Sequence, residues 1–164
     1  GDGAVLDSGD TTASIRRMAL GNDNSVYLSL NKRTRFRTVI NIESFVALDN
    51  QTTYVITGNT VPTTDFFGFK IQEATIWGVA TTAGTESTIS LSSMSNITDT
   101  KLEARYYPTQ KIDFYVDDVL KGSLTSGLPR TNSIYNEIYR YTISTAEAES
   151  KTLYIQYFEI IQER

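Results

Sequence analysis

The chain of 164 residues contains neither cysteine nor histidine. Without cysteine there are no disulfides and no thiol nucleophiles. Without histidine the chain lacks the most frequent general base of enzymes and the commonest zinc and copper ligand. We therefore expect no cofactor, no metal site and no catalytic residue.

Long basic runs and long apolar runs are absent as well. The net charge is -4, whereas binding to nucleic acid requires a concentration of Lys and Arg that neutralises phosphates. No apolar stretch approaches the roughly 20 residues that cross a bilayer. We expect no nucleic-acid partner and no insertion into a membrane.

Aromatic and branched residues are what the chain has in quantity, including ten Tyr and seven Phe. These side chains favour strands, because they fit a pleated and half-buried surface. The length suits one domain that buries its own core. We predict a single all-β domain over residues 15–164, preceded by a polar, turn-forming arm or edge extension over residues 1–14.

Alternation of apolar and polar residues predicts the strands. Val26, Leu28 and Leu30 alternate with polar neighbours, and Phe36 and Ile40 do so beyond a turn at 31–33. The helix-like stretch 145–151 is short and is expected to be a turn. Evenly spaced short strands, about ten in all, predict an antiparallel two-sheet β-sandwich. The further predicted strands cover 54–57, 66–72, 74–81, 88–91, 101–107, 111–116, 119–123, 137–144 and 153–160.

The clearest local prediction is a hairpin that turns at Asp117 and Asp118. Alternation assigns the side chains of the two strands before this turn to opposite faces of the sheet. The predicted core face carries Leu102, Ala104, Tyr106, Ile112, Phe114 and Val116, and the predicted outer face carries Glu103, Arg105, Tyr107, Lys111, Asp113 and Tyr115.

Several runs, taken in order, resemble concanavalin A-like or laminin-G-like jelly-roll domains. They are DFFGFKI at 65–71, IWGVA at 76–80, TEST at 85–88, KIDFYVDDVLKGS at 111–123, LP at 128–129 and LYIQYFEI at 153–160. The resemblance extends over roughly residues 34–160 and implies a jelly roll. Such domains occur in phage and other virion surface or tail proteins and in secreted carbohydrate-binding modules, although a fold does not by itself determine function.

The resemblance implies a domain on a virion surface or outside cells, which adheres to a glycan or decorates a particle. The absence of histidine, cysteine and a strand with paired acidic residues predicts that this domain is non-enzymatic. A carbohydrate-binding module of a secreted protein and a glycan-cleaving enzyme are the alternatives, and a homo-oligomer is a possible assembly. Relatives that hydrolyse glycans carry alternating acidic residues of the form Glu-x-Asp-x-x-Glu, which this sequence lacks.

A glycan site is expected where aromatic rings stand beside polar groups, because rings stack on sugars and buried hydroxyls need partners. The outer-face residues Arg105, Tyr107, Asp113 and Tyr115 form such a set. Three further residues join it if their strands lie alongside, and ordinary sheet composition or core packing explains them otherwise. These are Trp77, Tyr139 and Tyr141.

A basic stretch places Arg33, Arg35 and Arg37 on one strand face. This face suits an anionic partner, either an acidic glycan or a neighbouring subunit. An edge strand that positive charge protects against unwanted pairing is the second interpretation.

Two sets of acidic residues have simpler explanations than catalysis or metal binding. Glu103 and Asp113 could face each other as the carboxyl pair of a glycosidase, but cross-strand pairing with Arg105 or Lys111 neutralises them more simply. Asp113, Asp117 and Asp118 offer oxygen ligands for calcium, but a plain hairpin accounts for all three.

Overall fold

The computed structural model describes residues 4–7, 15–21, 28–42, 51–60, 63–72, 74–94, 97–132, 137–145 and 152–163. For residues 6–7, 15–21, 60, 63, 137–140 and 142–145 it describes the backbone. This part of the chain forms twelve β-strands. It contains no helix of the length and apolar character that would span a membrane.

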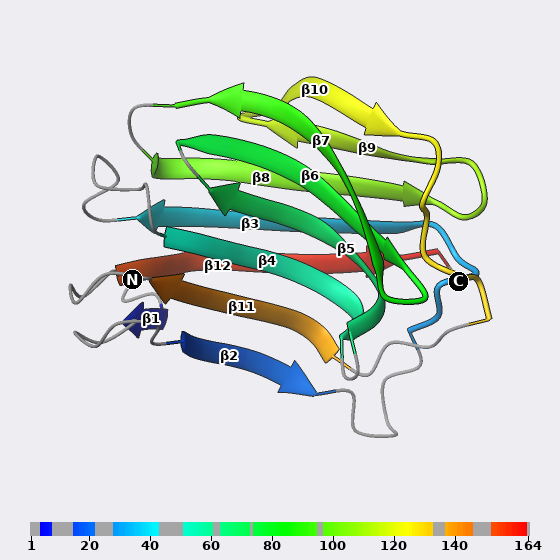
Figure 1. The fold of residues 1–164 in the computed structure, drawn as a ribbon, viewed down its shortest axis with the longest axis horizontal. Coiled ribbons are helices and arrows are strands. Elements are labelled where there is room, and N and C mark those ends of the chain that lie inside the picture. Colours follow the sequence, from blue (N-terminus) through cyan, green and yellow to red (C-terminus); the bar gives the residue numbers. More distant parts are fainter. Residues whose placement is uncertain are drawn as a thin grey trace.

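Two six-stranded antiparallel sheets pack face to face (Figure 1). Sheet A has the order β1 (Ala4–Asp7), β12 (Thr152–Gln162), β3 (Thr34–Ile42), β8 (Ile97–Tyr107), β9 (Lys111–Val116) and β10 (Val119–Leu124). Sheet B has the order β2 (Ile15–Gly21), β11 (Glu137–Thr145), β4 (Gln51–Thr60), β5 (Thr63–Gln72), β6 (Thr75–Thr82) and β7 (Thr85–Ser93). The predicted two-sheet antiparallel β-sandwich is confirmed.

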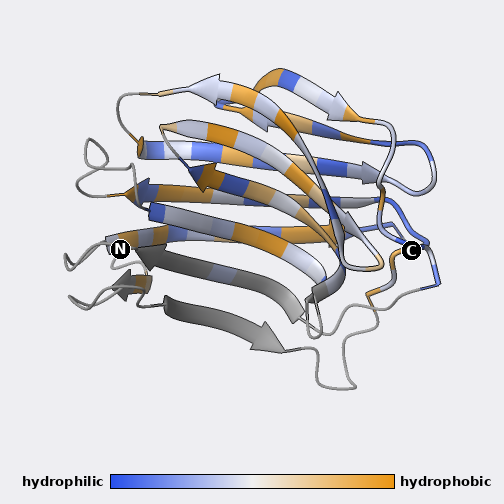
Figure 2. Ribbon diagram, viewed as in Figure 1, coloured by the Kyte–Doolittle hydropathy of each residue, from blue (hydrophilic) through white to orange (hydrophobic). Residues whose placement is uncertain are grey.

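The core lies between the sheets and follows the alternation of the sequence, which Figure 2 shows as alternating hydrophobic and hydrophilic bands along the strands. Aromatic rings join the two sheets across it. Phe67 stacks on Tyr106 with ring centroids 5.1 Å apart, and Phe69 meets Phe114 edge to face at 5.6 Å. Burial of these large rings supplies a major part of the hydrophobic stabilisation.

The predicted hairpin forms as expected. Val116 pairs with Val119, and the two turn residues Asp117 and Asp118 adopt positive φ angles of 49° and 64°. Two successive positive φ angles match the twist of the flanking strands. The predicted core and outer faces of β8 and β9 are confirmed, since the residues of the core face are buried.

The amino-terminal third differs most from the prediction. The strand predicted to end at Leu30 is wrong where the structure describes it, because Leu30 lies in a turn, buried in the core. The sequence patterns did not identify β2, and residues 4–7 of the predicted arm form β1, which pairs with β12 at the edge of sheet A. Residues 146–151 of the helix-like stretch lie outside the described residues.

The edge-strand interpretation of the basic stretch is also wrong. Strand β3 is an interior strand that pairs with β12 on one side and β8 on the other. Its arginines therefore stand in the middle of a sheet face, where protection against edge-to-edge pairing is not needed.

Candidate functional site

Strands β3, β8, β9 and β12 bring a set of polar and aromatic side chains to the outer face of sheet A. In the β8–β9 pair, Arg105 is opposite Asp113 and Tyr107 is opposite Lys111. Tyr115, the fourth predicted residue on these strands, lies on the same face, opposite Glu103. The structure thus brings together the predicted residues Arg105, Tyr107, Asp113 and Tyr115.

Cationic groups lie over both tyrosine rings. The guanidinium carbon of Arg105 is 4.3 Å from the ring centroid of Tyr115. The guanidinium carbon of Arg33 and Nζ of Lys111 are 5.5 Å and 5.3 Å from the ring centroid of Tyr107. Cation–π attraction orients these cations, so the rings hold the charges in place.

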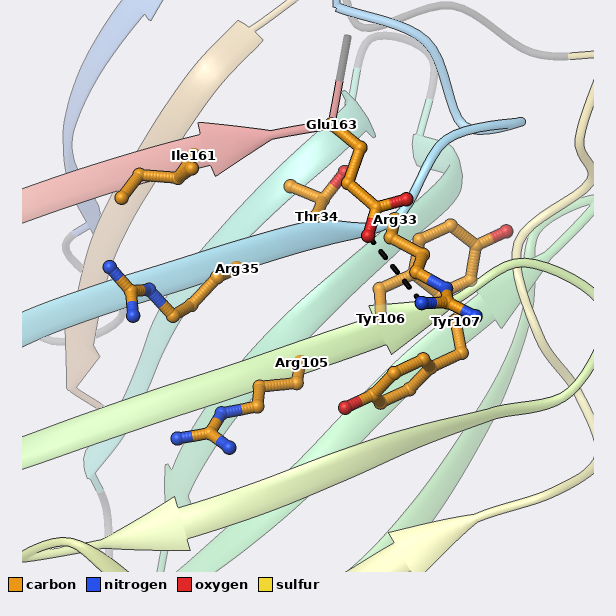
Figure 3. A pocket seen from close by; sticks show the side chains of 8 residues that line it. All are labelled: Arg33, Thr34, Arg35, Arg105, Tyr106, Tyr107, Ile161 and Glu163. Carbon is orange, nitrogen blue, oxygen red and sulfur yellow. Dashed lines mark hydrogen bonds and ion pairs between the residues drawn. The ribbon is translucent and has the colours of Figure 1, made fainter.

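A pocket of about 330 Å³ opens at the end of this face where β3 begins and β8 ends. Figure 3 shows the side chains of Arg35 and Arg105 side by side on neighbouring strands, with their guanidinium groups directed away from Tyr107, whose ring lies beside Arg33. The pocket is lined by Arg33, Thr34, Arg35, Arg105, Tyr106, Tyr107, Ile161 and Glu163.

Glu103 neutralises two arginines on this face. Its carboxylate accepts hydrogen bonds from Arg37, whose Nη2 is 2.7 Å away, and from Nε of Arg105. Burial alone would raise the pKa of Glu103, but these hydrogen bonds from Arg105 and Arg37 outweigh it and lower the pKa. Glu103 is therefore ionised and structural.

Asp113 is 4% exposed, and its carboxylate is also bound by neighbouring side chains. Nζ of Lys111 lies 2.8 Å from its carboxylate, and the Ser123 hydroxyl donates a 2.5 Å hydrogen bond to it. The predicted facing pair of Glu103 and Asp113 is wrong, because Asp113 is opposite Arg105. Little of Asp113 is left for a ligand.

Each of the three aspartates weighed as calcium ligands already has a partner within the protein. Asp117 accepts a hydrogen bond from the backbone N–H of Lys101, and Asp118 forms an ion pair with Nζ of Lys101. Among the described residues, no group of three or more carboxylate, thiol or imidazole side chains is arranged to hold a metal.

The remaining predicted residues lie on the other sheet. Tyr141 is fully buried in the core, where its hydroxyl is 2.7 Å from Oγ1 of Thr38. Trp77 is half-buried on β6 of sheet B, opposite Lys70. Tyr139 is on β11 of sheet B, and its side chain lies outside the described residues. The expectation that these strands lie beside β8 and β9 is wrong.

Two pocket residues, Ile161 and Glu163, were not identified from the sequence. Ile161 comes from the carboxyl-terminal strand β12 and Glu163 directly follows this strand, each more than 120 residues from its neighbour at the start of β3 along the chain. Arg33 and Arg35 were identified, but as a set separate from the tyrosines. The pairing of β3 with β8 merges the two sets.

Solved structures share this fold at low sequence identity, while no protein-family model and no curated protein sequence matches the chain. The alginate lyase from Corynebacterium sp. superposes with a TM-score of 0.66 and 7% identity, over 98% of this chain and 77% of that one. The receptor-binding domain of botulinum neurotoxin D gives 0.61 and 11%, over 98% of this chain and 40% of that one.

A structure of botulinum neurotoxin type C, whose cell entry depends on interaction with two ganglioside molecules, gives 0.61 and 13%, over 97% and 43% of the two chains. The chain thus spans about two fifths of the neurotoxin structures. Identities of 7% to 13% establish a shared β-sandwich.

Proposed function

We propose that this chain is a non-enzymatic glycan-binding domain, and that it binds through the pocket formed by β3, β8 and β12. The observation that carries the proposal is the juxtaposition of the Tyr107 ring with Arg33, Arg35 and Arg105 around a hollow of about 330 Å³. This volume is at the small end of the range for ligand pockets.

The pocket lining has the two properties that sugars require. Rings such as Tyr107 offer a flat apolar surface to the C–H groups of a sugar. Each guanidinium carries several N–H donors. Its main hydrogen bonds to protein groups use some of these donors and leave the others for a ligand. The carboxylate of Glu163 adds oxygen acceptors for sugar hydroxyls.

Binding without turnover follows from the state of the acidic residues. A glycosidase needs one carboxyl group that donates a proton and a second that acts as base or nucleophile. The lowered pKa of Glu103 is the reverse of what a general acid needs. Asp113 is buried in an ion pair with Lys111. We accordingly infer that Glu103 and Asp113 do not hydrolyse a glycan bound on this face.

The setting that we propose is the surface of a virion or another extracellular assembly, with a sandwich of the concanavalin A-like kind. The resemblance of the runs at 65–71 and 111–123 supports this setting. Support for glycans or surface receptors as partners comes from the structural neighbours, one of which interacts with gangliosides and another of which was solved with rat synaptotagmin II. A carbohydrate-binding module of a secreted protein would use the same surface.

A glycan array followed by titration tests the proposal. The wild-type chain should bind at least one glycan class, and Tyr107→Ala should weaken binding about tenfold without changing the thermal midpoint by more than a few degrees. Tyr157→Ala is the matched control, because Tyr157 is an exposed tyrosine of sheet A that does not line the pocket. An array without any ligand would reject the proposal, and release of shortened oligosaccharides would show an enzyme instead.

A further inference from the structure

The pocket has more hydrogen-bond donors than acceptors. Its lining contains three arginines and one carboxylate, that of Glu163. Glu163 reaches Arg33 at 3.5 Å, and both side chains are more than half exposed, so this ion pair is weak. No carboxylate of the lining is therefore a strong partner for the guanidinium donors of the pocket.

Arg35 and Arg105 lie directly opposite each other in the β3–β8 pair. Like charges at opposed positions repel each other. Both strands are in the interior of sheet A, so they cannot move apart at a sheet edge to relieve this repulsion. Glu159 pairs with Arg35 at 3.0 Å and Glu103 pairs with Arg105, and neither carboxylate lines the pocket. Nε of Arg35 is buried without any hydrogen-bond partner in the structure.

The positions of the arginines are fixed by their surroundings. The Tyr115 ring supports the guanidinium of Arg105 at 4.3 Å. The backbone carbonyl of Arg33 accepts a 3.1 Å hydrogen bond from the N–H of Glu163. A site whose donors are already oriented loses less conformational entropy on binding.

An apolar side chain completes the lining. Ile161 is 46% exposed and belongs to β12, where it is the partner of Arg35. A ligand that meets both Arg35 and Ile161 needs an anionic group close to an apolar surface. A sugar ring that carries a carboxylate or a sulfate has this combination.

We propose that the pocket selects acidic sugar residues, with the anionic group between Arg35 and Arg105 and the sugar ring against Tyr107 and Ile161. The inference rests on the proposed function, since it specifies which glycans the same pocket binds. A planar carboxylate matches the guanidinium fork with two parallel hydrogen bonds, so carboxylated sugars are the preferred class and sulfated sugars the alternative source of the same charge.

Calorimetric titration with matched oligosaccharides tests this selectivity. The probes are a uronic-acid oligosaccharide, the same oligosaccharide with its carboxyl groups reduced to alcohols, and a sulfated neutral oligosaccharide of equal length. The uronate should bind at least tenfold more tightly than its reduced form, and its affinity should fall as salt is added, because partly exposed charges are screened. Stronger binding of the sulfated probe than of the uronate would reassign the anionic group.

Equal affinity for the uronate and its reduced form would overturn the acidic selectivity while leaving glycan binding intact. Failure of all probes, together with an array without ligands, would reject the proposed function itself. The two failures are therefore distinguishable.

Variants locate the effect in the pocket. Arg35→Lys keeps the charge but loses the planar fork, and Arg33→Gln removes an exposed charge; each should weaken uronate binding roughly tenfold. Glu163→Gln should strengthen it about two- to fivefold, because Arg33 loses its competing carboxylate.

The control is Lys121→Gln, which removes one positive charge from the exposed surface of β10, at the far edge of sheet A. It should leave uronate affinity unchanged. An equal loss in this control would show that net charge, and not the pocket, determines binding.

Discussion

Arg35 on β3 and Arg105 on β8 occupy directly opposed positions on two interior strands of sheet A. The two positive charges repel each other, whereas opposite charges at these positions would attract. The carboxylates of Glu159 and Glu103 offset part of this repulsion from the sides. Binding sites often keep arrangements that are unfavourable for folding alone.

Substitution of Arg35 should therefore separate stability from binding. Arg35→Gln removes the repulsion and also the partly buried pair with Glu159, so the free energy of unfolding should change by no more than about 1 kcal/mol. Urea denaturation measures this change, and titration with the uronate oligosaccharide should show the loss of affinity in the same preparation. A large loss of stability would indicate that Arg35 is a structural residue.

Glu103→Gln should destabilise the sandwich. The variant leaves Arg37 and Arg105 without their shared carboxylate, and we expect a cost of about 1 to 2 kcal/mol, since both arginines still reach water. Because the pKa of Glu103 is lowered in the folded state, its contribution is present at neutral pH and is lost as the pH falls through the acidic range.

The check is urea denaturation of wild type and Glu103→Gln at neutral pH and in acid. The difference between the two proteins should shrink in acid. A difference that is constant with pH would contradict the assigned ion pairs.

Ionisation of Tyr106 should lower the stability of the sandwich at alkaline pH. Its hydroxyl donates to the carbonyl oxygens of Leu30 and Pro129, and burial, with a smaller contribution from Asp65, raises its pKa to about 12. The unfolded chain ionises near pH 10, so this contribution to stability is complete below pH 10 and declines toward the folded pKa, by up to about 2 to 3 kcal/mol.

Comparison with Tyr106→Phe isolates this effect. The variant should be about 1 to 2 kcal/mol less stable than wild type at neutral pH, because two carbonyls lose their donor. This gap should narrow above pH 10. If alkali destabilises both proteins equally, Tyr106 does not titrate as described.

Gly78→Ala should damage the core without touching the pocket. A Cβ atom at position 78 would lie 2.6 Å from the ring of Phe114, and overpacking of this kind costs about 1 to 3 kcal/mol. In Gly122→Ala the nearest atom is the flexible end of Ile89 at 3.0 Å, so a smaller loss is expected. Thermal melts of both variants compare the two positions, and equal melting temperatures would contradict the packing of β6 on β9.

Local alternation was sufficient to predict the strands from β3 onward and the two faces of β8 and β9. It failed for β2, where Arg16 and Arg17 are adjacent and no period of two is visible. The inclusion of Tyr141 failed for another reason, because it depended on strand order: β11 belongs to sheet B, and Tyr141 is buried in the core.

The site was predictable only in parts, because local patterns do not specify the order of strands in a sheet. The arginines of β3 and the tyrosines of β8 and β9 were visible separately in the sequence. The site combines them through the β3–β8 pairing, which joins residues about 70 positions apart. Ile161 of β12 and Glu163, which follows this strand, complete the pocket.

A map of the residues that respond to a bound glycan tests the central claim most directly. Amide chemical shifts of the isotope-labelled chain would be followed during titration with the uronate oligosaccharide. The account predicts that the largest changes cluster at residues 33–35, 105–107 and 161–163, around the pocket of sheet A. Changes centred on Trp77 and its neighbours on sheet B, with none around Arg35 and Arg105, would contradict it.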